Sequence, residues 1–417
     1  MTKISKKIAK VPNLRFPEFS EEWIKTNLGD VARKVNSGKT PLGGEVTYSS
    51  EGILFIRSQN VNNDKLELEN SVFISDEINN GMQNSIVKPN DILLNITGAS
   101  LGRSCVVPAN FTIGNVNQHV CIIRLYEKFN PRFLQPIFSS NKGQNIFLSL
   151  QTGSGREGLN FESIKRIQLY FPSLPEQNKI ASFLSLIDER IQTQSKVITQ
   201  LESLMQGIRE KIFKQQLRFK DVNGNDFPDW GMKKLRDIGT RIISKNKENN
   251  QKVLTISAQM GLISQLDFFN KSVAAKDVTN YYLLTKNDFA YNRSYSDGYP
   301  MGAIKKLTRY DKGVVSTLYI CFRLNSDTDT DFIEQYFETG IQNSEIEKFA
   351  QEGSRNHGLL NISISDFFNI KISIPCLEEQ TKIANFLSTI DERINTEKQL
   401  LKQYENQKKY LLQNIFI

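Results

Sequence analysis

The chain has 417 residues, of which 39% are hydrophobic and 24% charged, a composition that excludes general disorder and predicts two or more folded domains. The formal net charge of +8 suggests a polyanionic partner. However, the excess of +5 over residues 1–168 equals the five cations of the N-terminal arm, which are Lys3, Lys6, Lys7, Lys10 and Arg15. Any surface for nucleic acid is therefore expected to be a local patch.

The N-terminus, residues 1–12, is polar and lysine-rich, with no apolar stretch after it that would indicate a signal peptide. No run of the sequence approaches the roughly 18 apolar residues of a membrane span. We therefore expect a cytoplasmic protein. The four cysteines form no CxxC pair and there are only two histidines, so a zinc site is not expected and the cysteines are expected to be reduced and mostly buried.

The first half of the chain reads as strands followed by a helix. An apolar strand precedes Arg57, and an alternating apolar run ends at Arg124 and Leu125. His119 lies at the start of that run and is expected to belong to a strand rather than to a ligand pair. The segment Asn130-Pro131-Arg132-Phe133 reads as the start of a helix, which Phe133, Leu134 and Ile137 continue at helical spacing.

A long helix is predicted over residues 173–216. Its start has the capping-box spacing Ser173-x-x-Glu176, with Pro175 in the first turn. Apolar residues then follow at alternating steps of four and three, a period typical of a coiled coil. These residues are Ile180, Leu184, Ile187, Ile191, Ile198, Leu201, Met205, Ile208 and Ile212.

The second half of the chain repeats the first. Trp23, Leu28, Asp30 and Val31 correspond to Trp230, Leu235, Asp237 and Ile238, and residues 90–95 match residues 287–292. Arg323 and Leu324 again end an alternating run, and a helix-period stretch again follows, with Phe332, Ile333, Tyr336 and Phe337. The scaffold is kept while most loop residues differ, a pattern that suits two recognition surfaces with different targets.

A second long helix is predicted over residues 376–417. Residues 169–213 align without gaps onto residues 372–416, with 20 identities in 45 positions, so the two helices are copies of one element. The second heptad series is Ile383, Leu387, Ile390, Ile394, Leu401, Tyr404, Leu411 and Ile415, with Glu397 and Lys408 as polar interruptions. A pseudo-twofold relation between the halves predicts that the two helices pair as an antiparallel coiled coil.

Three short motifs resemble catalytic or nucleotide-binding signatures. Residues 153–158 spell G-x-G-x-x-G, but a helix-like stretch precedes them, whereas a dinucleotide site needs a strand there. Gly38-Lys39-Thr40 lacks the upstream glycine of a phosphate-binding loop, and Asn130-Pro131-Arg132-Phe133 lacks the second proline of an amino-methyltransferase motif. We find no catalytic constellation and expect that the chain is not an enzyme.

The duplicated helix between two diverged domains resembles the specificity subunit of Type I restriction–modification systems over essentially the whole chain. The local signatures that resemble this family are Leu14-Arg15-Phe16-Pro17 with Trp23, residues 53–61, 90–102, 287–304 and 313–324, and the Glu-Gln-x-Lys-Ile-Ala start of both long helices. Each short signature is weak alone. Together with the repeated helix they are specific.

The resemblance implies an α+β fold with two similar mixed α/β target-recognition domains, separated by two long helices that form an antiparallel coiled coil with a pseudo-twofold internal repeat. The expected divisions are a first recognition domain with its basic arm (1–172), a first helical spacer (173–216), a second recognition domain (217–375) and a second helical spacer (376–417).

The resemblance also implies the function and partners. The chain would be a non-catalytic subunit whose two domains each read one half of an asymmetric bipartite site on double-stranded DNA, while the helices set the spacer. Two methyltransferase (modification) subunits and, in the full complex, restriction/translocase subunits would be its partners. S-adenosylmethionine, ATP and Mg²⁺ would then belong to those subunits. The alternative is a stand-alone DNA-binding or coiled-coil scaffold protein without a methyltransferase partner.

DNA-contacting residues are expected in polar loops, because Arg, Lys, Asn and Gln read base edges, while hydroxyl and cationic side chains also bind phosphates. The candidates in the first domain are Arg57, Ser58, Gln59, Asn60, Thr97, Ser100, Arg103, Asn117, Gln118, Ser154 and Arg156. The candidates in the second domain are Asn292, Arg293, Ser294, Tyr295, Ser296, Lys305, Arg355, Asn356 and His357. For each of them the alternative is an ordinary solvated loop residue.

Overall fold

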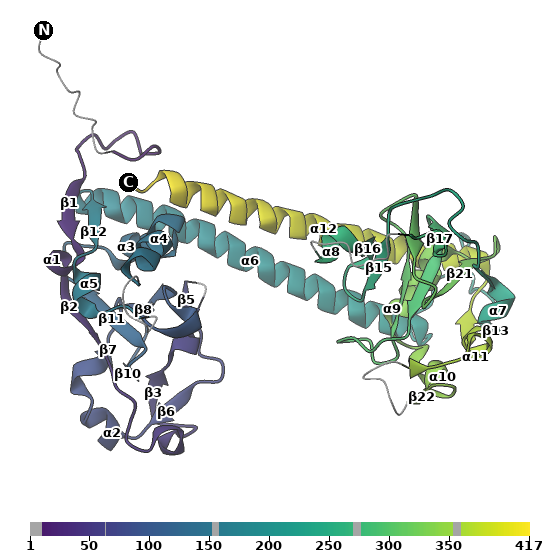
Figure 1. The fold of residues 1–417 in the computed structure, drawn as a ribbon, viewed down its shortest axis with the longest axis horizontal. Coiled ribbons are helices and arrows are strands. Elements are labelled where there is room, and N and C mark those ends of the chain that lie inside the picture. Colours follow the sequence, from purple (N-terminus) through teal and green to yellow (C-terminus); the bar gives the residue numbers. More distant parts are fainter. Residues whose placement is uncertain (1–10, 63, 152–157, 270–276, 353–359) are drawn as a thin grey trace, which may run out of the picture. The chain divides into compact units, whose positions relative to one another are not determined.

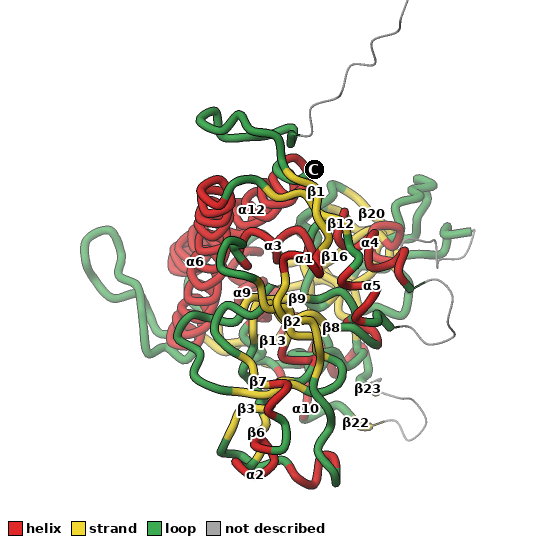
Figure 2. Tube along the Cα trace, turned by 90° about the vertical axis from the view of Figure 1, so that its left-hand side faces the viewer, coloured by secondary structure: helices red, strands yellow, loops and turns green. Residues whose placement is uncertain are grey.

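The computed structural model describes residues 11–62, 64–151, 158–269, 277–352 and 360–417 (Figure 1). Its contacts divide the chain into two compact units. Unit 1 comprises Met1–Ser195 and Gln399–Ile417, and unit 2 comprises Lys196–Lys398. Each unit therefore contains one half of each long helix, α6 (Leu174–Phe213) and α12 (Leu377–Asn414), both drawn in red in Figure 2.

Unit 1 contains twelve named strands in the part of the chain that the structure describes. They are β1 (Ile24–Asn27), β2 (Ala32–Ser37), β3 (Ile53–Ile56), β4 (Val61–Asn62), β5 (Lys65–Leu66), β6 (Val72–Ile74), β7 (Ile86–Val87), β8 (Ile92–Asn95), β9 (Ser104–Val106), β10 (Gly114–Val116), β11 (Val120–Leu125) and β12 (Gln168–Phe171). Its shorter helices are α1 (Leu28–Val31), α2 (Asp76–Asn80), α3 (Pro131–Ser139), α4 (Asn141–Leu150) and α5 (Phe161–Lys165).

The central sheet of unit 1 has the antiparallel order β2-β11-β8-β9. Alternate residues of a strand point to opposite faces, so the sheet separates two cores. Ile92 and Leu94 pack into the core formed with the helices, whereas Leu93 packs into a second core beneath the sheet of order β6-β3-β10-β7. In that second sheet β10 runs parallel to β3, so their carboxyl ends meet at one edge.

Unit 2 repeats this plan. Its strands are β13 (Gly231–Lys234), β14 (Gly239–Arg241), β15 (Leu254–Ser257), β16 (Gly261–Ser264), β17 (Tyr282–Thr285), β18 (Phe289–Asn292), β19 (Ala303–Lys306), β20 (Lys312–Val315), β21 (Ile320–Leu324), β22 (Gln351–Glu352), β23 (Leu360–Asn361) and β24 (Lys371–Ile374). Its shorter helices are α7 (Leu235–Ile238), α8 (Gln265–Phe269), α9 (Thr330–Glu338), α10 (Asn343–Glu347) and α11 (Ile364–Asn369). The sheet β14-β21-β18-β19 corresponds to β2-β11-β8-β9, and the pair β13-β24 corresponds to β1-β12.

The two central sheets share an ion pair between a buried aspartate and an arginine at the equivalent turn. Asp91 accepts hydrogen bonds from Arg124, with Nε–Oδ1 2.6 Å, and Asp288 accepts them from Arg323 at the same distance. Both aspartates are 1% exposed and follow an asparagine with positive φ, Asn90 or Asn287. The duplication inferred from sequence is therefore a duplication of structure.

The long helices pair antiparallel inside each unit. In unit 1 the start of α6, with Ile180 and Leu184, shares a core with the end of α12, with Leu411 and Ile415. In unit 2 the end of α6, with Met205 and Ile212, shares a core with the start of α12, with Ile383 and Leu387. These are the predicted heptad positions, so the predicted antiparallel pairing is confirmed in each unit (Figure 1).

The start of each long helix is held by an arginine and a tryptophan. Glu176 accepts hydrogen bonds from Arg15 (Nη2–Oε2 2.7 Å) and Trp23 (Nε1–Oε1 3.2 Å). Glu379 accepts them from Arg218 (2.9 Å) and Trp230 (3.1 Å). The capping-box interpretation did not indicate these partners for Glu176. The carboxylates are 1% and 0% exposed, so each buried charge is paired as burial requires.

Three of the four cysteines are buried and the fourth, Cys376, is exposed; all four are free, as expected. Burial raises the pKa of the Cys121 and Cys321 thiols to about 12, which keeps them protonated and unreactive at neutral pH. In the described part of the chain, no helix has the length and apolar character that crossing a lipid bilayer requires.

Candidate nucleic-acid interface

Most predicted contact residues of the first domain gather where three strands end. Because β3 and β10 are parallel, the residues after both strands meet, and the Asn117 amide donates to the carbonyl of Ile56 (3.1 Å). Asn95, at the end of β8, donates from Nδ2 to the Ser58 carbonyl (2.8 Å). We call residues 57–60, Thr97 and residues 117–119 the first polar cluster.

Two asparagines of the first polar cluster shape its loops. Asn60 is 2% exposed; its Nδ2 donates to the Glu67 carbonyl (2.9 Å) and its Oδ1 accepts the Arg57 amide (2.9 Å). Asn117 is 7% exposed, and its Oδ1 accepts the His119 amide (3.0 Å). Their amide groups hold backbone in place, which leaves little of either side chain for a base edge.

Other residues of the first domain keep polar atoms at the surface. Gln59, Gln118 and Arg103 are exposed, and Ser58, Thr97 and Ser100 are half-buried. Arg103 donates from Nη1 to Asn62 Oδ1 (3.0 Å), which steadies the guanidinium without covering it. Arg57 is half-buried, with its guanidinium 5.7 Å from the centre of the Tyr48 ring and Nη2 3.4 Å from the Asn70 carbonyl.

The predicted contacts of the second domain follow β18, the counterpart of β8. Arg293 donates from Nη1 to the Ile362 carbonyl and from Nη2 to the Leu318 carbonyl, both at 3.3 Å. Tyr295 is 63% exposed, and Asn292, Ser294 and Ser296 are half-buried. We call residues 292–296 the second polar cluster.

A glycine permits the second polar cluster to lie close to β19. Gly302 has φ +76°, and a Cβ there would lie 2.2 Å from the Asn292 carbonyl oxygen. Only glycine accepts both that backbone conformation and that close approach. The turn of Ser296 against Tyr299, with reciprocal backbone hydrogen bonds, completes the loop.

Lys305 has an internal position. It lies on β19, is 6% exposed, and its Nζ forms an ion pair with Glu338 Oε1 (2.5 Å) while donating to the Tyr299 hydroxyl (2.9 Å). That hydroxyl donates to the other oxygen of Glu338 (2.7 Å). The charge of Lys305 is thus neutralised inside unit 2, which leaves little of it for a DNA phosphate. Of the remaining predicted residues, five lie outside the described residues: Ser154, Arg156, Arg355, Asn356 and His357.

Two residues that were not among the predicted contacts form hydrogen bonds with members of the first polar cluster: His119, within it, and Thr40, beside it. His119 contacts Thr97 through Nδ1 (2.6 Å) and Gln118 through Nε2 (3.1 Å). Thr40 donates to the side-chain oxygen of Gln118 from 78 residues away in sequence. No local pattern marks such a pair, because only the sheet brings the two segments together.

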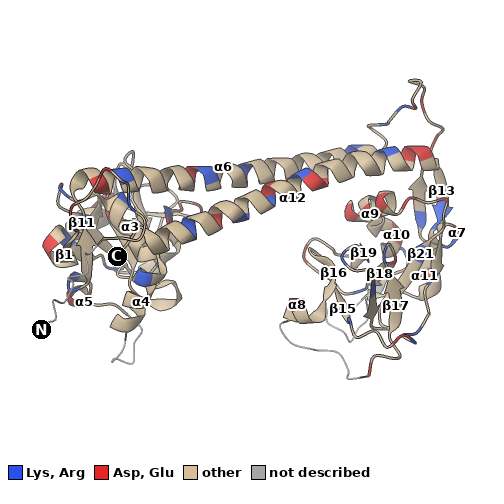
Figure 3. Ribbon diagram, turned by 90° about the horizontal axis from the view of Figure 1, so that it is seen from above, with Lys and Arg blue, Asp and Glu red and all other residues tan. Residues whose placement is uncertain are grey.

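Charges of both signs are mixed along the long helices (Figure 3). Among the described residues, no group of three or more His, Cys, Asp or Glu side chains has the arrangement of a metal site. By its fold, the molecule belongs to the class of internally duplicated proteins in which each half combines a mixed α/β domain with parts of two antiparallel long helices.

Comparison with known proteins identifies the family. Residues 20–203 and 228–406 match the Type I restriction modification DNA specificity domain. The chain belongs to this family.

Three relatives illustrate the similarity. The Type I restriction enzyme EcoBI specificity subunit of Escherichia coli is 26% identical over 208 residues, which cover 48% of this chain and 42% of that protein. The MjaVIII specificity subunit of Methanocaldococcus jannaschii is 26% identical over 348 residues, 78% of each chain. The crystal structure of the S subunit from M. genitalium has a TM-score of 0.57 at 15% identity, over 98% of this chain and 99% of that one, which supports the fold.

Proposed function

We propose that this chain is the DNA sequence-recognition subunit of a Type I restriction–modification complex, with each domain reading one half of a bipartite site. The observation that carries the proposal is the contrast between scaffold and loops. Both domains keep an ion pair between a buried aspartate and an arginine, Asp91–Arg124 and Asp288–Arg323. The loops that follow β8 and β18 differ in sequence and in their hydrogen bonds, as two surfaces with different targets require.

The chemistry of the clusters fits base-edge and phosphate recognition. Gln59, Gln118 and Arg103 are exposed side chains of the types that bind adenine, guanine and phosphate in a DNA groove. Tyr295 adds an exposed aromatic ring in the second domain. Phosphate contacts position a protein on DNA, and base contacts select the sequence.

Catalysis is proposed to reside in partner subunits. Two methyltransferase subunits would dock on the complex and bring S-adenosylmethionine, and restriction/translocase subunits would bring the ATP and Mg²⁺ chemistry. The paired helices are proposed to set the spacer. Helix α6 spans 40 residues, a length of about 60 Å at ~1.5 Å per residue.

The decisive experiment is methylation-sensitive genome sequencing of cells that carry this chain with its candidate methyltransferase subunits. We expect a single asymmetric bipartite methylated sequence, and exchange of residues 217–375 for those of another family member should change one half-site only. A chain that purifies without a methyltransferase subunit and leaves the genome unmethylated would instead be a stand-alone DNA-binding or scaffold protein.

A further inference from the structure

His119 lies between two predicted contact residues and is held rigidly. Its backbone amide donates to Asn117 Oδ1 (3.0 Å), and its carbonyl accepts the Ile96 amide (3.0 Å). These bonds fix the start of β11, so the imidazole is aimed at Thr97 on one side and at Gln118 on the other. The side chain is half-buried.

The hydrogen bonds around the His119 ring form a chain in which each group donates to the next, from Thr40 through Gln118 and His119 to Thr97. The Thr40 hydroxyl donates to the side-chain oxygen of Gln118, so the amide nitrogen of Gln118 faces His119 Nε2 and donates to it. A neutral imidazole that accepts at Nε2 carries its proton on Nδ1. Nδ1–H then donates to the Thr97 hydroxyl oxygen at 2.6 Å.

The orientation of the His119 ring determines the direction in which the Thr97 hydroxyl forms hydrogen bonds. A hydroxyl that accepts from an imidazole retains its own hydrogen, which it can donate to an acceptor outside the protein. Thr97 is half-buried, and His119 lies between it and the exposed Gln118. We propose that His119 sets the hydrogen-bond polarity of the first polar cluster and makes Thr97 a donor to an acceptor group of the first DNA half-site. This inference rests on the proposed function, within which His119 is a positioning residue.

The second domain organises the equivalent place differently. Counting from the matched Arg124 and Arg323, the position of His119 is taken by Leu318, which is 71% exposed. There the guanidinium of Arg293 donates to the Leu318 carbonyl and holds the two loops together. The hydrogen-bonded arrangement around His119 therefore occurs in the first domain and not at the equivalent place of the second. Its loss is expected to leave recognition of the second half-site unaffected.

The test uses three substitutions of His119 in the full chain, assembled with its methyltransferase subunits. Asparagine places an amide group near the position of Nδ1, and glutamine places one near the position of Nε2. His119→Asn should therefore keep much of the contact with Thr97, whereas His119→Gln and His119→Ala should lose it. The matched control is Leu318→Ala at the equivalent position of the second domain.

The probes are duplexes that carry the methylated sequence found in cells, with either half-site scrambled. For the wild type we expect strong preference for the intact sequence. His119→Gln and His119→Ala should lower discrimination of the first half-site about 5-fold, the effect of one neutral hydrogen bond of ~1 kcal/mol. His119→Asn should lower it less, and none should change the second half-site.

Modified DNA then identifies the acceptor. Loss of discrimination requires that the acceptor is a base edge, because phosphate contacts do not select the sequence. One 7-deazapurine in the first half-site should therefore weaken wild-type binding but add no further loss in His119→Gln. A methylphosphonate linkage that has this effect instead would assign Thr97 to the backbone and overturn the inference. Thermal melting of each variant, unchanged within a degree or two, shows that the fold is intact.

The outcomes separate the two proposals. The role of His119 is overturned if the wild type discriminates between intact and scrambled duplexes and if His119→Gln and His119→Ala discriminate as well as the control Leu318→Ala. The proposed function would then still stand. A wild-type complex that does not distinguish intact from scrambled duplexes overturns the proposed function, and this inference with it.

Discussion

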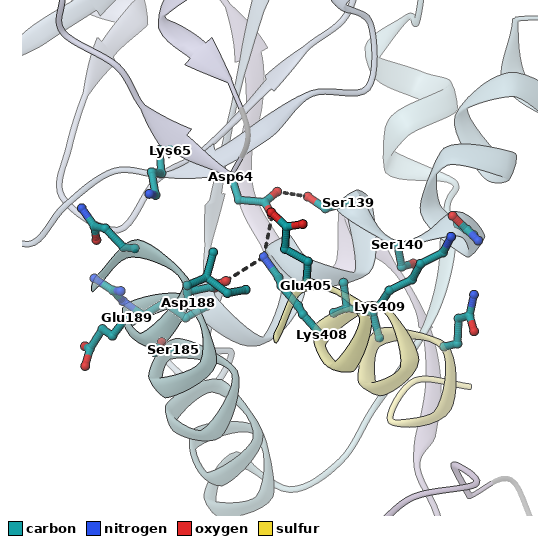
Figure 4. Close-up of a pocket in the computed structure, with 16 residues that line it drawn as sticks. Asp64, Lys65, Ser139, Ser140, Ser185, Asp188, Glu189, Glu405, Lys408 and Lys409 are labelled. Carbon is teal, nitrogen blue, oxygen red and sulfur yellow. Dashed lines mark hydrogen bonds and ion pairs between the residues drawn. The ribbon is translucent and has the colours of Figure 1, made fainter. Parts of the chain in front are cut away.

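Lys408 of helix α12 forms an ion pair with Asp64, 344 residues earlier in the chain, with Nζ–Oδ2 3.0 Å. The same ammonium group lies 2.7 Å from Asp188 of helix α6 (Figure 4). Asp64 is also bonded to the Ser139 hydroxyl and to Gln135 of helix α3. Within unit 1, the loop between β4 and β5 is thus tied to both long helices through one lysine.

Lys408→Met should destabilise unit 1. The equivalent residue of α6 is Met205, so the substitution fits a heptad position, but it leaves the Asp64 carboxylate without its cation. A loss of about 2 kcal/mol is expected, the scale of a hydrogen bond to a charged group. Urea unfolding of the single variant and of Lys408→Met with Asp64→Asn measures it. The double variant should recover part of the loss; a double variant less stable than the single one contradicts the assignment.

The same pair predicts a pH dependence. Burial raises the pKa of Asp64, but Lys408, Ser139 and Gln135 outweigh it and leave that pKa below its ordinary value. The pair therefore stabilises unit 1 above pH ~4, the ordinary aspartate value, and this stability is lost as pH falls through the lower folded pKa. The melting temperature of the wild type should fall more steeply below pH ~4 than that of the double variant. Parallel curves would show that the pair contributes nothing.

Burial lowers the pKa of Lys408, but Asp64 and Asp188 outweigh it and raise that pKa above its ordinary value. The stabilising effect of this shift is present below pH ~10.4 and is lost as pH rises through the raised pKa. The difference in melting temperature between the wild type and Lys408→Met should therefore become smaller as pH rises through the alkaline range.

The arginine–glutamate pairs at the helix starts should be equally important in the two units. Arg15→Met leaves Glu176 charged and 1% exposed, and Arg218→Met does the same to Glu379 at 0%. Breaking a buried pair in this way costs about 3 kcal/mol. The chain has two tryptophans, Trp23 and Trp230, one beside each pair. Fluorescence of single-tryptophan variants therefore reports each unit separately, and each substitution should lower the unfolding midpoint of its own unit first.

Arg103→Ala should weaken DNA binding without changing sequence preference. Arg103 is exposed beside the first polar cluster, where a guanidinium suits a phosphate. Removal of one phosphate contact should reduce the slope of log affinity against log salt by about one. Arg166→Ala, an exposed arginine at the end of α5, serves as the control. A changed half-site preference would mean that Arg103 reads a base.

Deletion of one heptad from each long helix, residues 193–199 and 396–402, should alter the spacer of the methylated site. Each helix would shorten by about 10 Å at ~1.5 Å per residue, and the heptad pattern would stay in phase. Methylation-sensitive sequencing should show a changed spacer between unchanged half-sites. Altered half-sites with the original spacer would contradict the proposal that the helices set the distance.

The repetitive and periodic features were predictable from sequence. The heptad series, the α3 start at Asn130 and the strand that ends at Arg124 follow from local patterns, and the structure confirms them. The buried position of Lys305 was not predictable, because it depends on Glu338 from helix α9, 33 residues later. The contact of His119 with Thr97 depends in the same way on the pairing of β11 with β8. Individual DNA contacts stay predictions.

The duplicated aspartate–arginine pairs have a consequence for how such a chain changes over evolutionary time. Asp91 and Arg124 stabilise the turn and the central sheet of unit 1, while Gln59, Gln118 and Arg103 lie at its surface and carry little of the core. Substitution of these three exposed residues should therefore leave the free energy of unfolding nearly unchanged. Single substitutions of exposed loop residues can therefore change the target preference of one domain at a time while the chain stays folded.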